Sequence, residues 1–286
     1  MKEWVDQLRF LEQSRGTYSQ SCQDRVLDHV FSHTKTVNPQ PYCVEFGFNS
    51  DSLTTGSGSN VAKLVLERGW KSLLLDGSRE NRSINLYKHF LTSQNICDVF
   101  ASYRVPREPE YISIDVDSTD LWLFEALLST YRALLYSVEY NANFPLHCAI
   151  TKVNNPAETW KGDACYGASL KALTMVAQAH GYSLLWVVPG LDAFFIRNDL
   201  IDDGTELITF PYRRWKFCTG LPEHLRASHP EQINSFLDYE VYLESGGDTL
   251  AGRRKAARVC RRLLLGNSMQ QFYRKFRRFL NHGHNN

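Results

Sequence analysis

Acidic or amide side chains follow four successive apolar runs of the sequence, and such side chains can bind ligands or move protons. Each run has the length and the β-branched and aromatic content of a buried strand. The side chains at or just beyond the ends of these runs are Glu45, Asp76, Asp115, Asp117, Glu139 and Asn141. The carboxyl ends of parallel strands meet at one edge of a sheet, where open α/β sheets bind ligands. The simpler alternative is helix capping, as Asp117 or Thr119 would provide for a helix beginning near residue 120. Four strands ending this way in succession favour a site.

The stretch from Cys43 to Gly77 predicts a parallel β-α-β crossover. It reads CVEFGF, then the loop NSDSLTTGSGSN, then VAKLVLERG and WKSLLLDG. The helix would have Ser59 or Asn60 as its N-cap and would stop at Gly69. Such a helix points free N–H groups at a ligand. An acidic side chain that ends the second strand can accept a hydrogen bond from a ribose hydroxyl, so Asp76 predicts a nucleoside-bearing ligand.

The glycines of this loop match no phosphate-binding motif. The loop contains neither GxGxxG nor GK[ST], which argues against hydrolysis of ATP or GTP. Gly56 and Gly58 lie in TTGSGS, which is equally typical of a flexible linker.

Asp115 and Asp117 form a second group of interest. Two carboxylates held on one strand face repel each other and need a cation or hydrogen-bond donors nearby. Paired carboxylates bind divalent metals in nucleotide-sugar transferases. A divalent metal is therefore compatible with this pair, although the sequence predicts no metal site.

The alternation of apolar runs with amphipathic segments predicts an α/β fold with a doubly wound, mostly parallel sheet of the seven-stranded type. The expected strands cover residues 43–48, 72–75, 96–102, 111–116, 132–140, 182–188 and 193–197, and the expected helices cover residues 22–33, 61–68, 80–91, 120–130 and 166–181. Because Pro189-Gly190 joins the last two strands as a hairpin, one terminal strand should be antiparallel. Residues 141–165 lack periodicity, as functional loops often do.

The chain is expected to have three parts: an N-terminal helical segment (1–37), a Rossmann-like domain (38–200), and a peripheral wrap with a basic helical tail (201–286). Residues 251–286 carry ten of the 32 Lys and Arg residues and no Asp or Glu, so the remainder is net acidic. A helical tail of this kind suits an anionic membrane surface or an acidic partner, which includes the body of this chain. Nucleic-acid phosphates are the least favoured partner, because the tail has no recognised nucleic-acid fold.

The overall composition, 43% hydrophobic and 22% charged, is that of a globular protein. The first residues, MKEWVDQLRF, lack the apolar core of a signal peptide, and no apolar run reaches the ~18 residues of a membrane span. The seven cysteines are scattered, with no CxxC pair and no zinc-site spacing, which favours reduced thiols. We therefore expect a soluble, cytoplasmic protein.

The order of several motifs resembles the FkbM-like branch of the S-adenosylmethionine-dependent methyltransferases. The motifs read CVEFGF with SN, LLLDG, YISIDVDSTDLWLFEAL, ALLYSVEYN, YGASLKAL with HGYSLLWV, and GLDAFFIRNDL. The resemblance covers about residues 19–200 and includes Ser19-Gln20-x-x-Gln23-Asp24, which is similar to the SQxxQD element that precedes that domain. It implies a class I methyltransferase fold with S-adenosylmethionine as the cofactor.

The resemblance also implies roles for individual residues. Glu45 and Gly47 would contact the methionine part of the cofactor and Asp76 its ribose, while Asp115 and Asp117 would lie beside the sulfonium and the acceptor. The expected cofactor-binding residues are Glu45, Gly47, Asn49, Asp51, Ser59, Asn60, Asp76, Gly77, Ser102 and Asp115.

The loop after the first strand departs from the pattern of the family. That pattern is a compact turn, acidic-x-Gly-x-(Asp or Gly)-Gly, whereas here Phe48 follows Gly47 and the next glycine is Gly56. The loop is longer, and we expect Asp51 to replace the usual loop acid.

The reaction that this resemblance implies is O-methylation of a small-molecule or glycan acceptor. Methyl transfer is an in-line displacement, for which the enzyme supplies positioning and a water-poor site, and a hydroxyl acceptor needs a base. Candidate bases are Asp117, Glu139 and His147, although a solvated loop histidine is the simpler interpretation of the last. The expected acceptor-side residues are Asn141, Trp160, Asp163 and Tyr166, of which Tyr166 could equally belong to the core.

Two other functions fit the same residues. One is a catalytically inactive interaction protein that keeps the methyltransferase fold. The other is a metal-dependent glycosyltransferase that uses Asp115 and Asp117.

Overall fold

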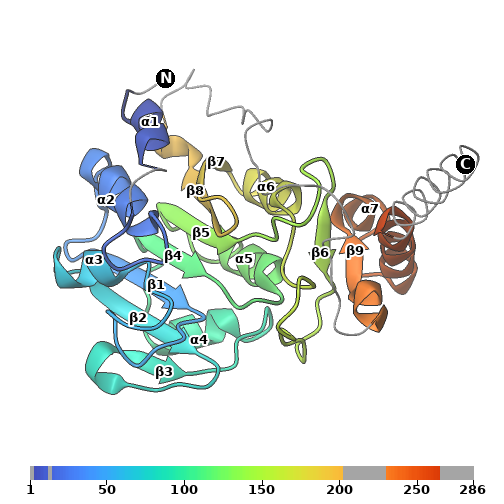
Figure 1. Ribbon diagram of the computed structural model, residues 1–286, viewed down its shortest axis with the longest axis horizontal. Helices are drawn as coiled ribbons and strands as arrows, with labels where there is room; N and C mark the ends of the chain where they lie inside the picture. Colours follow the sequence, from blue (N-terminus) through green and yellow to red (C-terminus); the bar gives the residue numbers. More distant parts are fainter. Residues whose placement is uncertain (1–2, 12–14, 202–229, 265–286) are drawn as a thin grey trace, which may run out of the picture.

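Seven strands form one central sheet in the computed structural model, which describes residues 3–11, 15–201 and 230–264 (Figure 1). The strands are Tyr42–Phe46 (β1), Lys71–Asp76 (β2), Leu86–Lys88 (β3), Tyr111–Ile114 (β4), Leu135–Glu139 (β5), Tyr182–Val187 (β7) and Asp192–Arg197 (β8). Their order is β3-β2-β1-β4-β5-β8-β7, and β8 runs opposite to the other six strands. The α/β class and the mostly parallel seven-stranded sheet are thus confirmed. The antiparallel strand lies between β5 and β7, not at the edge of the sheet.

Helices cover both faces of this sheet because alternate strand residues are apolar on both sides. One face packs against Glu3–Gln7 (α1), Gln23–His33 (α2) and Ala62–Leu66 (α3), and the other against Ile96–Ser102 (α4), Asp120–Leu128 (α5) and Leu170–Ala179 (α6). Val44 and Phe46 pack into the core on the face covered by α4, α5 and α6, whereas Cys43 packs into the core on the face covered by α1, α2 and α3. Glu45 has the same parity as Cys43, so its carboxylate faces α3.

The strand order changes direction between β1 and β4. The chain runs outward from β1 through β2 to β3, then returns to the other side of β1 and continues through β4 to β5. The loops after β1 and β4 therefore diverge from adjacent strand ends. This is the place where open α/β sheets form a ligand-binding crevice.

Two expected elements are wrong. Residues 80–91 were expected to be helical, but they form one 3-10 turn, Arg82–Ile84 (η2), and the edge strand β3. The turn ends because Asn85 is left-handed (φ 59°). Residues 96–102 were expected to be a strand, but they form α4. Thr92 and Asn95 exchange side-chain to backbone hydrogen bonds just before this helix, and Ile96 and Phe100 bury one face of it.

A small two-stranded sheet lies beside α5 and α6 (Figure 1). Ile150–Lys152 (β6) pairs antiparallel with Phe236–Asp238 (β9), which follows the 3-10 helix Pro230–Ser235 (η6) and precedes Tyr239–Glu244 (α7). Tyr239 and Tyr242 of α7 contact Trp122 of α5 edge-on. No local sequence pattern predicts this sheet, because each of its strands has only three residues and they pair over a long distance in the chain.

A helix over residues 250–264 confirms the first part of the expected helical tail. Every fourth residue is buried, namely Gly252, Ala256, Cys260 and Leu264, and Cys260 and Leu264 pack with Phe144, Ile150 and Phe236. The exposed face carries Arg253, Arg254, Lys255, Arg258, Arg261 and Arg262. The apolar face of this segment therefore packs on the chain itself. The rest of the expected tail, residues 265–281, lies outside the described residues.

Within residues 3–11, 15–201 and 230–264, no helix has the length and apolarity needed to cross a bilayer.

Candidate functional site

Gly47 and Asp115 bring the ends of β1 and β4 into direct contact at the switch point. Gly47 has φ +81°, and a Cβ placed on it would lie 1.3 Å from the carbonyl oxygen of Asp115. Two clefts open on either side of this contact, and both residues line both clefts. We call the cleft towards α2 and α3 the first cleft and the cleft towards β2 and residues 158–160 the second cleft.

Glu45 fastens the loop after β1 to the start of α3. Its carboxylate accepts hydrogen bonds from Ser59 Oγ at 2.6 Å, from the Asn60 N–H at 2.8 Å and from the Val61 N–H at 3.4 Å. Burial raises the pKa of Glu45 to about 7, although these donors oppose the shift. Ser59 is therefore a structural partner of Glu45 and does not line either cleft.

The loop over residues 47–60 is a folded unit and not an extended linker. Phe48 and Leu53 are buried in the core beneath it, and Asn49 Nδ2 donates to Ser57 Oγ at 2.7 Å across the loop. Gly58 (φ +112°) leaves no room for a Cβ, which would lie 2.7 Å from Tyr18 O and from Gln20 N. The glycine thus serves close packing against the segment that precedes α2.

Asp51, expected to replace a loop acid, is exposed and lines neither cleft. Its carboxylate lies 3.6 Å from Arg79, and its carbonyl accepts from Asn81 Nδ2 at 2.7 Å. These contacts attach the loop to the segment after β2.

The first cleft contains a buried acid that was missed in the sequence. Asp192 accepts hydrogen bonds from Gln23 Nε2 at 3.0 Å and Asn60 Nδ2 at 3.5 Å, and burial raises its pKa to about 6. It pairs with Glu139 in the β5–β8 register. Because β8 is antiparallel, its first residue lies at the edge of the sheet where the parallel strands end. A search for polar residues at the strand starts of the predicted hairpin would therefore have found Asp192.

The second cleft, about 250 Å³, lies over the end of β2. Asp76 Oδ1 accepts three hydrogen bonds of 2.7 Å, from Ser78 N–H, Ser78 Oγ and Arg79 N–H. Its Oδ2 makes no hydrogen bond within the described part of the chain. Gly77 and Asn49 also line this cleft, as does the exposed Trp160 on the opposite side.

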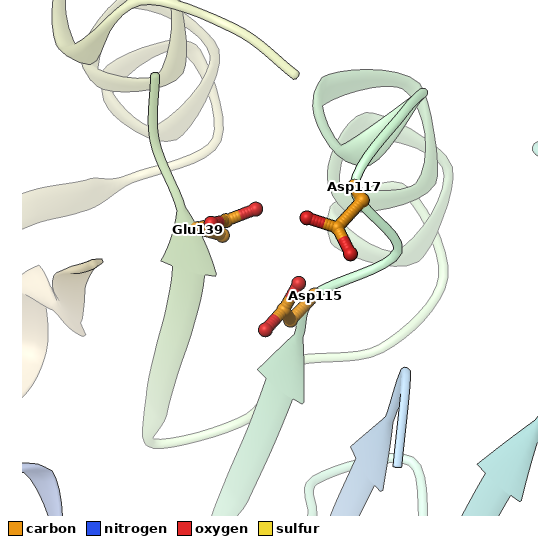
Figure 2. Close-up of side chains that lie close together, drawn as sticks. All are labelled: Asp115, Asp117 and Glu139. Atoms are coloured by element: carbon orange, nitrogen blue, oxygen red, sulfur yellow. The ribbon is translucent and has the colours of Figure 1, made fainter. Parts of the chain in front are cut away.

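Three carboxylates converge where the clefts meet. Asp115 and Asp117 follow β4, and Glu139 ends the neighbouring strand β5, so that one oxygen of each lies within 4.8 Å of the others (Figure 2). Asp117 has a left-handed backbone (φ 56°), which turns its side chain back towards the cluster. Burial, and then repulsion within the cluster, raises the pKa of Asp115 and of Glu139 well above the usual range, and burial also raises the pKa of Asp117.

The helix after this cluster is held by Asp120, not by Asp117. Asp120 accepts hydrogen bonds from the Val116 N–H at 2.7 Å and the Ser118 N–H at 3.0 Å. Thr119, at the N-cap, makes no side-chain capping bond. The capping alternative for Asp117 is therefore wrong.

Asn141 holds a loop in place instead of presenting its amide to a ligand. Its Nδ2 donates to the carbonyls of Ala164 and Tyr166, and its Oδ1 accepts from the N–H and the Nδ2 of Asn143. All four hydrogen-bonding positions of this amide are thus occupied.

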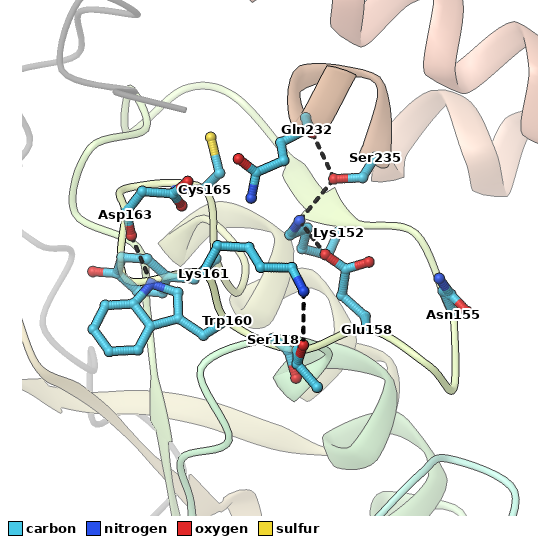
Figure 3. Close-up of polar contacts among 12 residues, drawn as sticks. Ser118, Lys152, Asn155, Glu158, Trp160, Lys161, Asp163, Cys165, Gln232 and Ser235 are labelled. Carbon is cyan, nitrogen blue, oxygen red and sulfur yellow. Dashed lines mark hydrogen bonds and ion pairs between the residues drawn. The ribbon is translucent and has the colours of Figure 1, made fainter. Parts of the chain in front are cut away.

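The loop that carries Trp160 is anchored by a buried ion pair. Lys152, 1% exposed, donates to Glu158 at 2.5 Å and to Ser235 Oγ at 2.7 Å (Figure 3). Trp160 Nε1 donates to the Asp163 carbonyl at 2.7 Å, which fixes the indole at the wall of the second cleft. Asp163 itself caps the following turn by accepting from the Cys165 N–H.

The remaining expected residues lie in different places. Tyr166 is half-buried beside Trp160, with ring centroids 6.5 Å apart, and burial followed by the charge of Glu139 raises its pKa. His147 is exposed and lines neither cleft. Ser102 is exposed at the end of α4 and donates to the Val99 carbonyl, since the strand expected there is a helix.

No protein-family model and no curated protein matches this chain.

Proposed function

We propose that the chain binds S-adenosylmethionine across the two clefts and transfers its methyl group to an acceptor hydroxyl, as the FkbM-like resemblance suggests. The seven-stranded, mostly parallel sheet supports a class I methyltransferase fold. The site also lies at the switch point between β1 and β4, where ligands of open α/β sheets bind.

The charge of the clefts is the observation that carries the proposal. Seven acidic residues and no Lys or Arg are found among the described residues that line them, and the acids are Glu45, Asp76, Asp115, Asp117, Glu139, Glu158 and Asp192. A nucleotide with a diphosphate would be repelled by this lining. A ligand with a positively charged sulfonium and a positively charged amino group would be attracted.

Gly47 and Asp76 also suit this cofactor. Gly47 lets the two strand ends approach without a side chain that would fill the junction of the clefts. The free Oδ2 of Asp76 can accept a hydrogen bond from a ribose hydroxyl, while Oδ1 holds the turn at residues 78 and 79. Gly47 and Asp76 are therefore compatible with bound S-adenosylmethionine.

Bound S-adenosylmethionine would supply a methyl carbon on a cationic sulfur, a leaving group that takes the electron pair of the carbon–sulfur bond. Asp117, which lines the second cleft, and Glu139, which lines the first, are the residues proposed to accept the proton of the acceptor hydroxyl. Trp160, held over the second cleft, would cover the acceptor and exclude water.

Calorimetric titration with S-adenosylmethionine tests the proposal, using Asp76→Asn as the diagnostic variant. The substitution keeps an oxygen for the turn but replaces the free oxygen with an N–H₂ donor. We expect saturable binding to the wild type and at least a tenfold loss in the variant, about 1.4 kcal/mol. The matched control is Asp98→Asn on the exposed side of α4, which should bind as the wild type does. A folded wild type that shows no binding at millimolar cofactor would overturn the proposal and favour the inactive interaction protein.

The carboxylate cluster favours one second candidate, a metal-dependent glycosyltransferase. Asp115 and Asp117 would then hold the metal that neutralises a nucleotide-sugar diphosphate. Manganese-dependent binding of a nucleotide sugar, in the absence of S-adenosylmethionine binding, would support this candidate.

A further inference from the structure

We propose that Asp115, Asp117 and Glu139 bind one hard divalent cation of the magnesium, manganese or calcium class. The three side chains come from two adjacent strand ends and one turn, and their oxygens converge (Figure 2). Ion binding does not depend on the proposed methyl transfer. The role of the ion in activating an acceptor does rest on that proposed function.

The spacing suits a single ion. Metal–oxygen distances of roughly 2.1 to 2.5 Å place the oxygens of one coordination sphere between about 3 and 5 Å apart. The three carboxylates each have an oxygen within 4.8 Å of the other two. All three ligands are oxygens, which selects hard cations over zinc or copper.

Glu139 provides an independent indication. Its Oε2 is buried and has no hydrogen-bond partner among the described residues, and Figure 2 shows its carboxylate pointing towards Asp117. A buried, unpartnered carboxylate oxygen is costly. A cation at the centre of the cluster would satisfy this atom.

Within the described residues, the charge of the cluster is not balanced by a Lys, Arg or His. No ion pair from Lys, Arg or His to these carboxylates is found in the described part of the chain. The alternative to a metal is a proton shared between Asp117 and Glu139, whose carboxyl groups face each other. The two alternatives differ in a measurable way, because a cation in the cluster binds saturably and displaces this proton.

The position of the ion would connect it to both clefts. Asp115 lines both, Glu139 lines the first and Asp117 lines the second. An acceptor hydroxyl bound to the ion would lose its proton more readily. Three carboxylates around one divalent cation still leave the site net negative, so a sulfonium would remain attracted.

The test is a titration of the full-length, EDTA-treated chain with Mn²⁺, followed by electron paramagnetic resonance, with Mg²⁺ and Ca²⁺ as competitors. We expect one Mn²⁺ per chain and at least tenfold weaker binding in Asp117→Asn and in Glu139→Gln. Asn tolerates the left-handed backbone at residue 117, so the first variant should keep the fold, and thermal unfolding checks both. Asp98→Asn serves as the matched control and should bind as the wild type does.

Absence of saturable Mn²⁺ binding, or binding unchanged in both cluster variants, would overturn the inference. S-adenosylmethionine is titrated into the same samples. Cofactor binding without any ion site would overturn this inference and leave the proposed function intact. Ion binding without cofactor binding would support the inference and count against the methyltransferase.

Discussion

The backbone of Gly47 lies directly against the carbonyl of Asp115, so close that a Cβ on residue 47 would come within 1.3 Å of that oxygen. This contact joins the ends of β1 and β4 at the switch point and separates the two clefts. Glycine is needed here for two reasons: the backbone at residue 47 has a positive φ, and there is no space for a Cβ. The same contact therefore determines both local stability and the shape of the site.

Gly47→Ala should destabilise the protein more than the same change at Gly69. Both glycines have positive φ, but no atom of the described residues lies within 4 Å of a Cβ at Gly69. Gly69→Ala should cost about 1 kcal/mol for the left-handed backbone alone, whereas Gly47→Ala should cost roughly 3 kcal/mol because the strand ends must also move apart. Urea unfolding measures the difference. Equal costs would show that the close approach to Asp115 does not constrain the fold.

The stability of the wild type should fall as pH rises from about 4.5 to about 7, partly through Glu45. Its pKa is about 7 in the folded chain, against 4.5 for a free side chain, so the folded state binds more protons in this window. Stability from protonated Glu45 is complete at low pH and is lost as pH rises through the folded pKa, on the order of 3 kcal/mol in all. Glu45→Gln should flatten this part of the profile in urea unfolding at several pH values. A variant profile as steep as that of the wild type would count against the assignment.

The Lys152–Glu158 pair should respond asymmetrically to removal of either charge. Lys152 is almost completely buried, whereas the side chain of Glu158 is 15% exposed. Glu158→Gln should cost about 3 kcal/mol, because it leaves a buried ammonium without its counter-charge. Lys152→Met should cost less, because Glu158 can reach water. Free energies of unfolding of the two single variants and the double variant test this order, and a larger cost for Lys152→Met would contradict it.

The central sheet could be predicted from the sequence because its strands are apolar runs with clear ends. The positions of Glu45, Asp76, Asp115 and Glu139 followed directly, since consecutive parallel strands bring their carboxyl ends to one edge. Short apolar runs are ambiguous between strand and helix, which is why residues 96–102 were assigned wrongly.

Other parts of the site depend on contacts between distant segments. Asp192 reaches the first cleft only because β8 runs antiparallel. Gln23, which donates a hydrogen bond to Asp192, precedes it by 169 residues in the sequence. The β6–β9 sheet and the Lys152–Glu158 pair arise from tertiary packing that leaves no local pattern. His147 was expected from its place in the irregular segment 141–165, and Ser102 from its place at the end of the expected strand 96–102. The structure places neither in a cleft.

The most direct test of the account is a crystal structure of the chain soaked with S-adenosylmethionine. We expect the ligand to bridge the two clefts beside Gly47, with a ribose hydroxyl within hydrogen-bonding distance of Asp76 Oδ2 and the sulfonium facing the cluster of Asp115, Asp117 and Glu139. A ligand bound elsewhere, or clefts that stay empty at saturating cofactor, would contradict the account.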